Sequence, residues 1–138
     1  MVLCTGNSCR SQMAEGYLRH FNPALKVYSA GIETHGVNPQ AVSIMKQDGI
    51  DISNHTSNLL DEYQSIDFDY VITVCDNAKE RCPVFSGKVN RIHQNFPDPA
   101  KAKGSEQEIT DSFEHTRNLI KSFCQQFVNR LNNNKRQS

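Results

Sequence analysis

The sequence lacks several features that would point to particular classes of protein. Its 138 residues carry no net charge, because 15 Lys and Arg side chains balance 15 Asp and Glu side chains. This balance gives no indication of a nucleic-acid or membrane surface. No apolar run approaches the roughly 18 residues of a membrane-spanning helix. No secretory leader precedes the first motif, so we expect a cytoplasmic protein that binds neither nucleic acid nor membrane.

The cysteine content excludes a further class. Five cysteines cannot all pair, and the chain is too long for a short secreted framework held by disulfides. We therefore expect reduced and reactive thiols rather than structural disulfides. The length suits one monomeric domain, predicted over residues 1–131, followed by a polar tail at residues 132–138 that frays.

Short apolar stretches alternate with helical patterns along the chain. Four short strands are predicted, at residues 1–4, 26–30, 70–74 and 89–92. Three helices are predicted, at residues 11–21, 39–49 and 109–131. A turn or short helix is predicted at residues 57–63. This alternation is typical of an α/β fold with a parallel sheet flanked by helices.

The most informative segment is Cys4-Thr5-Gly6-Asn7-Ser8-Cys9-Arg10-Ser11, which joins the first strand to the first helix. Gly6 and Asn7 can take left-handed backbone angles, so several N–H groups can converge on one oxyanion. A helix that begins near Ser11 adds the positive end of its dipole, and Arg10 can hold two oxygens of a tetrahedral anion. The predicted anion-binding residues are therefore Thr5, Gly6, Asn7, Ser8, Cys9 and Arg10.

Cys4 is expected at the floor of this anion site. The field that binds an anion also stabilises a thiolate, so we expect the pKa of Cys4 to be lowered. A cysteine and arginine at this spacing also occur together by chance, and a cysteine at a strand end is often only a small buried residue. The strand, glycine-containing loop and helix around the pair favour function, namely attack of Cys4 on phosphorus or arsenic.

Two further cysteines are candidates for redox chemistry. Cys75 directly follows the third strand, so it is expected with Cys4 at the edge of the sheet where α/β proteins bind ligands. Cys82 comes seven residues later. In an intact helix that spacing is about 10 Å, which is too far for a disulfide. The polar segment between these two cysteines is predicted to be only marginally helical.

Three interpretations of the thiols remain open at this point. Buried structural thiols are the interpretation favoured for Cys9, and for Cys124 on the apolar face of the last helix. A zinc site is disfavoured, because Cys75 and Cys82 are spaced more widely than usual zinc pairs and no histidine pair completes a site. The third interpretation is a relay in which Cys4, Cys75 and Cys82 exchange disulfides.

Asp98 is the candidate general acid. It lies between Pro97 and Pro99, which fix the local backbone and keep the segment out of a helix. A stiffly held carboxylate suits protonation of a leaving oxygen at hydrogen-bond range. The alternative is an ordinary Asp-Pro turn.

The segment from Cys4 to Gly16 resembles the signature of the low-molecular-weight tyrosine phosphatase superfamily, and most closely that of its thioredoxin-coupled arsenate reductases. Further matching stretches are residues 28–39 and 51–57, Val74-Cys75, Cys82-Pro83 and Asp98-Pro99. The resemblance implies a four-stranded parallel sheet in the order 2-1-3-4. It also implies that Cys4 takes arsenate as a covalent adduct while Arg10 and the loop amides hold the oxyanion. Ser11 would then support the thiolate, and Asp98 would protonate the leaving oxygen.

The same resemblance implies a relay of three thiols. Cys75 attacks Cys4, which releases arsenite and leaves a Cys4–Cys75 disulfide. Cys82 then attacks Cys75, and reduced thioredoxin restores the thiols from the Cys75–Cys82 disulfide. Phosphate and sulfate would mimic arsenate at the anion site.

Some members of this superfamily bind potassium beside the loop. The matching positions are Asn7, Glu15, Ser29 and Thr56, which therefore form a candidate potassium site. Asn58 stands where those relatives carry aspartate, so one negative charge is missing and dependence on potassium is in question. No other bound cofactor is expected, and the reducing equivalents come from thioredoxin.

Two other functions compete with arsenate reduction. A low-molecular-weight tyrosine phosphatase would use the same loop, but water resolves its phosphocysteine and no second cysteine is needed. Such phosphatases also tend to place aromatic residues after the Asp-Pro pair, where this chain has Ala100-Lys101. A non-catalytic oxyanion-binding or redox-sensing domain is disfavoured by the joint presence of Cys4, Arg10 and Asp98. The predicted function is therefore arsenate reduction, with weak phosphatase activity as a by-product.

Overall fold

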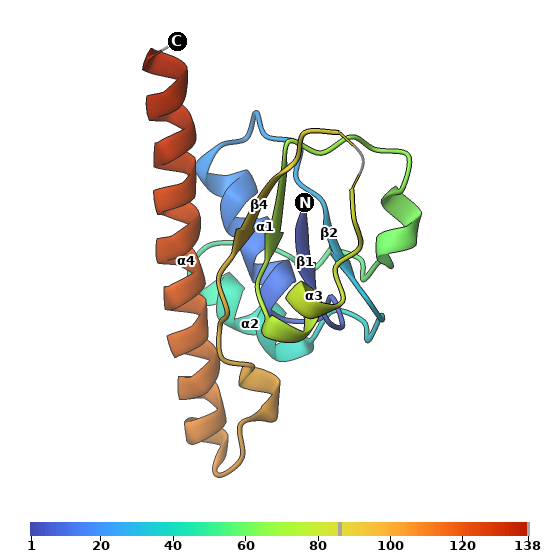
Figure 1. Cartoon of the computed structure of the whole chain (residues 1–138). Coiled ribbons are helices and arrows are strands. Elements are labelled where there is room, and N and C mark those ends of the chain that lie inside the picture. The colour runs from blue at the N-terminus through green and yellow to red at the C-terminus, as the bar shows by residue number, and fades with distance from the viewer. Residues whose placement is uncertain (86, 138) are drawn as a thin grey trace.

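The computed structural model describes residues 1–85 and 87–137. Its centre is a four-stranded parallel sheet in the order β2-β1-β3-β4, which confirms the predicted fold class. The strands are β1 (Val2–Cys4), β2 (Ser29–Gly31), β3 (Tyr70–Thr73) and β4 (Asn90–His93). The strands point the same way in Figure 1, so their carboxyl ends share one edge of the sheet.

The short strand β1 lies at the centre of the sheet. Leu3 pairs with Ala30 of β2 on one side and with Thr73 of β3 on the other. All three residues of β1 are buried, as expected for a parallel strand that is covered on both faces. Cys4 ends the strand opposite Gly31, so it lies at the carboxyl edge of the sheet.

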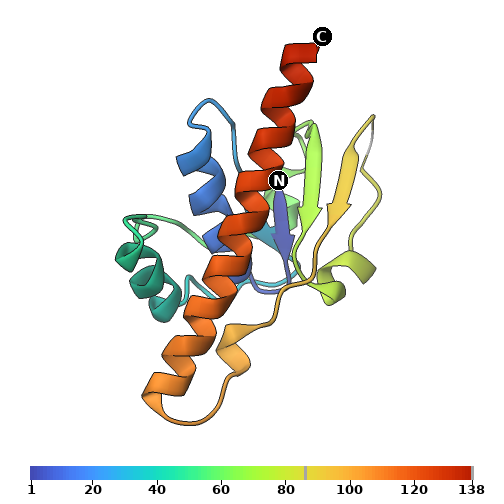
Figure 2. The same cartoon turned by 90° about the vertical axis from the view of Figure 1, so that its left-hand side faces the viewer.

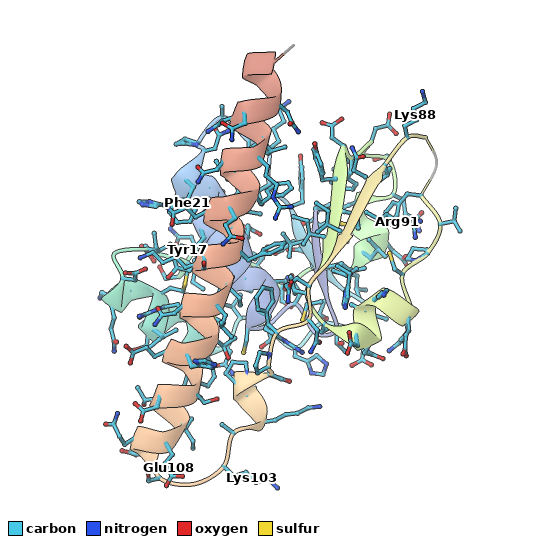
Figure 3. The ribbon with its side chains drawn as sticks, turned by 60° about the vertical axis from the view of Figure 1, so that its left-hand side comes forward. Tyr17, Phe21, Lys88, Arg91, Lys103 and Glu108 are labelled. Atoms are coloured by element: carbon cyan, nitrogen blue, oxygen red, sulfur yellow. The ribbon has the colours of Figure 1, made fainter. Side chains whose placement is uncertain are left out.

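Helices and short 3-10 turns surround the sheet. They are α1 (Arg10–Phe21), α2 (Pro39–Gln47), η1 (Leu60–Tyr63), α3 (Asp76–Glu80), η2 (Pro99–Lys101) and α4 (Glu106–Gln137). α1 lies between the sheet and α4, and Figure 2 shows α4 crossing in front of it. Tyr17 and Phe21 of α1 lie beside α4 in Figure 3. This central place explains why every residue from Ser11 to Leu18 is buried.

The start of α2 follows the sequence pattern closely. The Asn38 side chain accepts a hydrogen bond from the Gln40 N–H at 2.8 Å, and Pro39 takes the first helical position. After the helix, Gly49 has a φ of 79°, a left-handed angle that ends it.

The last helix is longer than the sequence predicts. Its apolar face is confirmed, because Phe113, Ile120 and Cys124 are fully or almost fully buried. The predicted end of the helix at residue 131 is wrong, because α4 continues through Gln137. Extending an existing helix costs far less than nucleating one, so the packed turns before Leu131 carry the polar turns after it. Ser138 lies outside the described residues.

A polar contact joins the helices on this side of the sheet. Asp48, just after α2, accepts hydrogen bonds from the Tyr17 hydroxyl at 2.7 Å and from the Lys121 ammonium at 2.9 Å. Each partner belongs to a different helix, so one carboxylate links α1 to α4 beside the end of α2. Within residues 1–85 and 87–137, none of the helices is long and apolar enough to cross a membrane.

Candidate active site

The loop between β1 and α1 turns its carbonyl groups outward. These groups accept hydrogen bonds as follows: Thr5 O from Glu33 N at 2.8 Å, Gly6 O from His35 N at 3.0 Å, Asn7 O from Gln12 Nε2 at 3.0 Å and Ser8 O from Asn38 N at 3.1 Å. In the part of the chain that the structure describes, the N–H groups of residues 6–9 donate to no backbone carbonyl. The loop therefore has the form of the predicted anion-binding nest, ahead of the N-terminus of α1.

Asn7 holds this loop in shape. Its φ of 48° is left-handed, and its side chain is completely buried. The side-chain nitrogen donates to the Ser11 hydroxyl at 2.8 Å and to the Ser29 hydroxyl at 2.9 Å, and its oxygen accepts from the Asn58 N–H at 2.8 Å. Three segments are thus bound to one amide, which offsets the cost of the left-handed backbone.

Glycine is required where β2 approaches the loop. A Cβ atom on Gly31 would lie 2.8 Å from the Thr5 carbonyl oxygen and 2.9 Å from the Asn7 nitrogen. Both neighbours are backbone atoms of the anion loop, so they cannot move aside without changing the loop. A Cβ atom on Gly6 would in turn collide with the ring of His35.

The structure brings Cys4 and Cys75 together, as the sequence predicts. Both side chains are almost fully buried, and the two thiols are close enough for each to be the largest influence on the pKa of the other. The Thr5 hydroxyl lies 3.2 Å from the Cys75 sulfur. The hydrogen bond from Cys4, the Thr5 hydroxyl and the Ala78 N–H lower the pKa of Cys75 to about 5, although burial opposes them.

The predicted lowering of the Cys4 pKa is wrong for this arrangement. The hydrogen bond to Cys75 and burial raise the pKa of Cys4, and the Arg10 charge only partly opposes them. The two thiols lie close together, so a negative charge on one disfavours a negative charge on the other. The donors around Cys75 favour the thiolate there over Cys4.

Arg10 and Asp98 also meet at this edge of the sheet. The Arg10 guanidinium donates to the Phe96 carbonyl at 2.9 Å and lies 3.6 Å from the Asp98 carboxylate. Asp98 caps η2 by accepting from the Ala100 N–H at 3.0 Å, so Pro99 and the cap hold it in place. The predicted acid and the predicted anion-binding arginine thus share one side of the nest.

Ser11, Cys9 and Cys124 are all buried in the structure. The buried Ser11 hydroxyl accepts from Asn7, and the hydrogen bonds of the described residues do not include one between Ser11 and Cys4. Cys9 precedes α1 and is buried, and burial raises its pKa to about 11. Cys124 is fully buried in α4. The predicted burial of Cys9 and Cys124 is therefore confirmed.

Cys82 lies beyond the end of a very short helix. α3 spans only Asp76–Glu80, which agrees with the predicted marginal helicity of the segment between Cys75 and Cys82. Cys82 is partly exposed, its sulfur lies 3.6 Å from the Pro83 carbonyl, and burial raises the pKa of its thiol. All five cysteines are free thiols in this structure.

The candidate potassium ligands already bind one another. Glu15 accepts from the Ser29 hydroxyl at 2.7 Å and lies 3.2 Å from the Arg19 Nε and 3.3 Å from the His55 Nε2. The Thr56 hydroxyl donates to the Asn58 amide oxygen at 2.6 Å. The Arg19 guanidinium thus adds positive charge beside Glu15, which disfavours a potassium ion in this arrangement.

Sequence reasoning missed two polar residues that shape the site. Gln12 is completely buried and binds Asn7 O, Thr56 O and the His55 ring. The sequence feature that could have indicated Gln12 is its position as a polar residue within the first helix, directly after the loop. His93 at the end of β4 binds both Thr73 and Asp76, and no local pattern in the sequence indicates this contact.

Comparison with known proteins agrees with this geometry. The family model described as low molecular weight phosphotyrosine protein phosphatase matches residues 1–137. The chain belongs to this family. Within it, the chain is 48% identical over 127 residues to the arsenate reductase of Bacillus subtilis (strain 168), which covers 91% of each chain. It is 53% identical over 111 residues to arsenate reductase 2 of Staphylococcus saprophyticus, which covers 79% of this chain and 85% of that protein.

Solved structures of the phosphatase family share the fold. An arsenate reductase in a phosphate-binding state superposes with a TM-score of 0.77 at 29% identity, covering 94% of this chain and 95% of that one. The tyrosine phosphatase Wzb from Escherichia coli K30, in complex with sulphate, superposes with a TM-score of 0.78 at 19% identity, covering 94% and 95%. The second likeness concerns the fold alone. The fold thus occurs in proteins named as reductases and in proteins named as phosphatases, so the fold alone does not distinguish the two activities.

Proposed function

We propose that this member of the phosphatase family reduces arsenate to arsenite through Cys4, Cys75 and Cys82, with thioredoxin as reductant. The observation that carries the proposal is the proximity of Cys75 to Cys4 beside the anion nest, where the Cys75 sulfur lies 3.2 Å from the hydroxyl of Thr5, the residue after Cys4. A phosphatase needs one cysteine and water, whereas a reductase needs a second thiol within reach of the first. The relatives named arsenate reductase support the same conclusion.

In the first step Cys4 attacks arsenate held by the loop N–H groups and Arg10. Binding of the anion turns the Arg10 guanidinium toward the substrate, and the proton of Cys4 passes to an oxygen of arsenate. An S–As bond forms as one As–O bond breaks. Asp98 delivers a second proton to the departing oxygen, which leaves as water.

In the second step the Cys75 thiolate attacks the sulfur of Cys4. An S–S bond forms and the S–As bond breaks, with its electron pair remaining on arsenic. Arsenic is thereby reduced from the +5 to the +3 state and leaves as arsenite, while the two sulfurs are oxidised to a disulfide. The hydrogen bond from Cys4, which lowers the pKa of Cys75 most, is lost once arsenic replaces the Cys4 proton, but the Thr5 hydroxyl and the Ala78 N–H still favour the Cys75 thiolate.

In the third step Cys82 attacks Cys75 and releases Cys4 as a thiolate. The Cys75–Cys82 disulfide requires the end of α3 to unwind, and a helix of five residues offers little resistance. Cys82 is the more exposed of the two sulfurs, so the disulfide becomes accessible to a dithiol reductant such as thioredoxin.

The decisive experiment measures arsenate-dependent NADPH oxidation in the presence of thioredoxin and thioredoxin reductase. Wild type should turn over steadily, whereas Cys82→Ser should stop after about one turnover with a Cys4–Cys75 disulfide that mass spectrometry detects. Cys124→Ala is the matched control, because it removes a buried thiol that lies outside the relay. Steady turnover by Cys82→Ser would exclude the relay.

Phosphotyrosine hydrolysis is the second candidate function. It is favoured by the family model and by the nest itself, which suits phosphate as well as arsenate. Rapid hydrolysis of a phosphotyrosine peptide without arsenate reduction would support this alternative over the relay. We expect slow hydrolysis only, because the site places a second thiol beside the nucleophile.

A further inference from the structure

The His93 ring binds the chain on both sides of Cys75. Its Nδ1 lies 2.7 Å from the Thr73 hydroxyl and its Nε2 lies 2.8 Å from the Asp76 carboxylate. A carboxylate only accepts hydrogen bonds, so Nε2 carries a proton and donates to Asp76. In the neutral ring Nδ1 then accepts from Thr73. One ring at the end of β4 thus holds residues two positions before and one position after Cys75.

Two further hydrogen bonds hold the first turn of α3. The Asp76 N–H donates to the Asn95 side-chain oxygen at 3.1 Å, on the side of β4. On the opposite side, the Asn77 side chain donates to the Thr5 hydroxyl at 2.9 Å, the same hydroxyl that contacts Cys75. The start of α3 is therefore held between the end of β4 and the anion loop.

The other end of the segment is held weakly. The Cys82 N–H reaches the Lys79 carbonyl at 3.4 Å, a long hydrogen bond. Arg81 lies 3.7 Å from Glu33 with both side chains about half exposed, whereas the His93–Asp76 contact is shorter, at 2.8 Å, and its His93 side chain is only 22% exposed. The Arg91 guanidinium donates to the Pro83 carbonyl at 3.1 Å, in an exposed contact. Val84 is 91% exposed. The chain from Lys79 to Val84 can therefore move at lower cost than the chain from Thr73 to Asn77.

We propose that His93 and Asp76 are positioning residues for the second and third steps of the proposed relay. The His93 clamp, made of Thr73, His93 and Asp76, keeps the Cys75 thiol against Cys4. Disulfide exchange with Cys82 then proceeds by movement of the Cys82 end toward a fixed Cys75. This inference rests on the proposed function for its catalytic consequence, but the clamp itself can be tested without arsenate.

The catalytic test uses the Cys82→Ser background, in which the reaction stops at the Cys4–Cys75 disulfide. His93→Ala and Asp76→Ala should slow formation of this disulfide between about 10- and 100-fold, because displacing a reacting group by about 1 Å has effects of that size. The KM for arsenate should stay within about twofold, because neither residue contacts the nest. Asp76→Asn should restore most of the rate, because its amide oxygen still accepts from His93.

A matched control separates the clamp from general effects of losing a histidine. His20 is exposed in the last turn of α1, so His20→Ala should leave the disulfide rate unchanged. Thermal unfolding and the inhibition constant for inorganic phosphate show whether each variant keeps its fold and nest. A disulfide rate in folded His93→Ala equal to wild type would overturn the proposal.

Hydrogen–deuterium exchange of the reduced protein tests the clamp apart from any reaction. In wild type the amides of residues 79–82 should exchange faster than those of residues 74–78. In His93→Ala the exchange of residues 74–78 should rise by about tenfold or more, toward that of residues 79–82. Unchanged exchange would overturn the clamp even if arsenate reduction proceeds. Faster exchange without arsenate reduction by wild type would support the clamp and refute the proposed function.

Discussion

The hydroxyl of Thr5 lies 3.2 Å from the sulfur of Cys75, although the two residues are 70 positions apart in the chain. Thr5 belongs to the loop that cradles the anion, and Cys75 follows the neighbouring strand β3. The contact therefore joins the binding loop to the second thiol. It also contributes to the low pKa of Cys75, after the larger contribution of the hydrogen bond from Cys4.

Replacement of Thr5 by valine should raise the pKa of Cys75. Valine has the same shape but donates no hydrogen bond, so the thiolate loses one of its donors. The pKa should move up from about 5 while staying below the ordinary cysteine value, because the bond from Cys4 remains. A pH titration of thiolate ultraviolet absorbance measures the change directly.

The kinetic consequence of Thr5→Val has a defined direction. In the acidic range, a higher pKa leaves less Cys75 as thiolate, so the second step slows most at low pH and recovers as pH rises. Thr110→Val on α4 makes the same chemical change away from the site and should leave the titration unchanged. An unaltered titration of Thr5→Val would show that the hydroxyl does not stabilise this thiolate.

Two substitutions at Asn7 separate its backbone from its side chain. Asn7→Ala loses the amide contacts and also places alanine at a φ of 48°, whereas glycine adopts that angle freely. Both variants should bind inorganic phosphate more weakly, because Ser11, Ser29 and Asn58 lose their shared partner. Each lost buried hydrogen bond costs about 1 kcal/mol, and alanine adds the cost of the strained backbone.

The measurement for Asn7 combines urea unfolding with the inhibition constant for phosphate. Asn7→Ala should unfold at lower urea than Asn7→Gly, and both should unfold below wild type. Asn22→Ala at the end of α1 is a matched change outside the loop and should leave phosphate binding unchanged. Equal stability of the alanine and glycine variants would mean that the left-handed angle carries no strain.

The sequence was sufficient to predict the elements that follow from local patterns. The apolar strand at residues 70–74, the Asn38 cap and the face of α4 with Phe113 and Ile120 all appear where expected. The short edge elements were less well defined: β2 is Ser29–Gly31 rather than 26–30, and β4 ends at His93. In such short strands, pairing with a neighbour rather than local propensity decides the ends.

The site could be predicted as a set of residues but not in its charge state. Cys4, Cys75, Arg10 and Asp98 lie together because the carboxyl ends of parallel strands share an edge. The position of the proton between Cys4 and Cys75 depends on donors such as the Thr5 hydroxyl, whose direction only the folded backbone sets. The helix extends past Leu131 for a similar reason, since its polar turns depend on the packed turns before them.

Replacement of Asp98 by asparagine tests its proposed role as acid. Asparagine keeps an oxygen that can accept from the Ala100 N–H, so the cap of η2 should persist. The rate of arsenate-dependent disulfide formation should fall by about 100-fold or more, because the departing oxygen no longer receives a proton. Binding of phosphate should not weaken, since loss of the carboxylate removes a negative charge beside Arg10.

The control for Asp98→Asn is Asp111→Asn on the exposed face of α4. It makes the same chemical change and should alter neither rate nor binding. A rate for Asp98→Asn within about twofold of wild type would assign proton delivery to another group. Weaker phosphate binding would instead indicate that Asp98 mainly orients Arg10.

The Asp48 contact predicts how stability depends on pH. The Lys121 ammonium and the Tyr17 hydroxyl hold the pKa of Asp48 below its ordinary value. At pH values between the pKa of Asp48 in the folded chain and its pKa in the unfolded chain, the unfolded chain binds more protons. The stability from this contact is therefore complete above the unfolded-chain pKa and is lost as pH falls through the folded-chain pKa. Asp48→Asn should therefore lower the urea midpoint at neutral pH, and its difference from wild type should shrink at about pH 3.

Tyr17→Phe tests the contribution of the hydrogen bond that the Tyr17 hydroxyl donates to the Asp48 carboxylate. It removes the 2.7 Å hydrogen bond and should cost about 1 kcal/mol at neutral pH. Tyr70→Phe is the matched control, since the Tyr70 ring packs edge-on against Phe127 rather than at Asp48. If Asp48 links the helices as described, the double variant Tyr17→Phe/Asp48→Asn should lose less than the sum of the two single losses. Strict additivity would mean that the two groups act independently and that the contact contributes no stability.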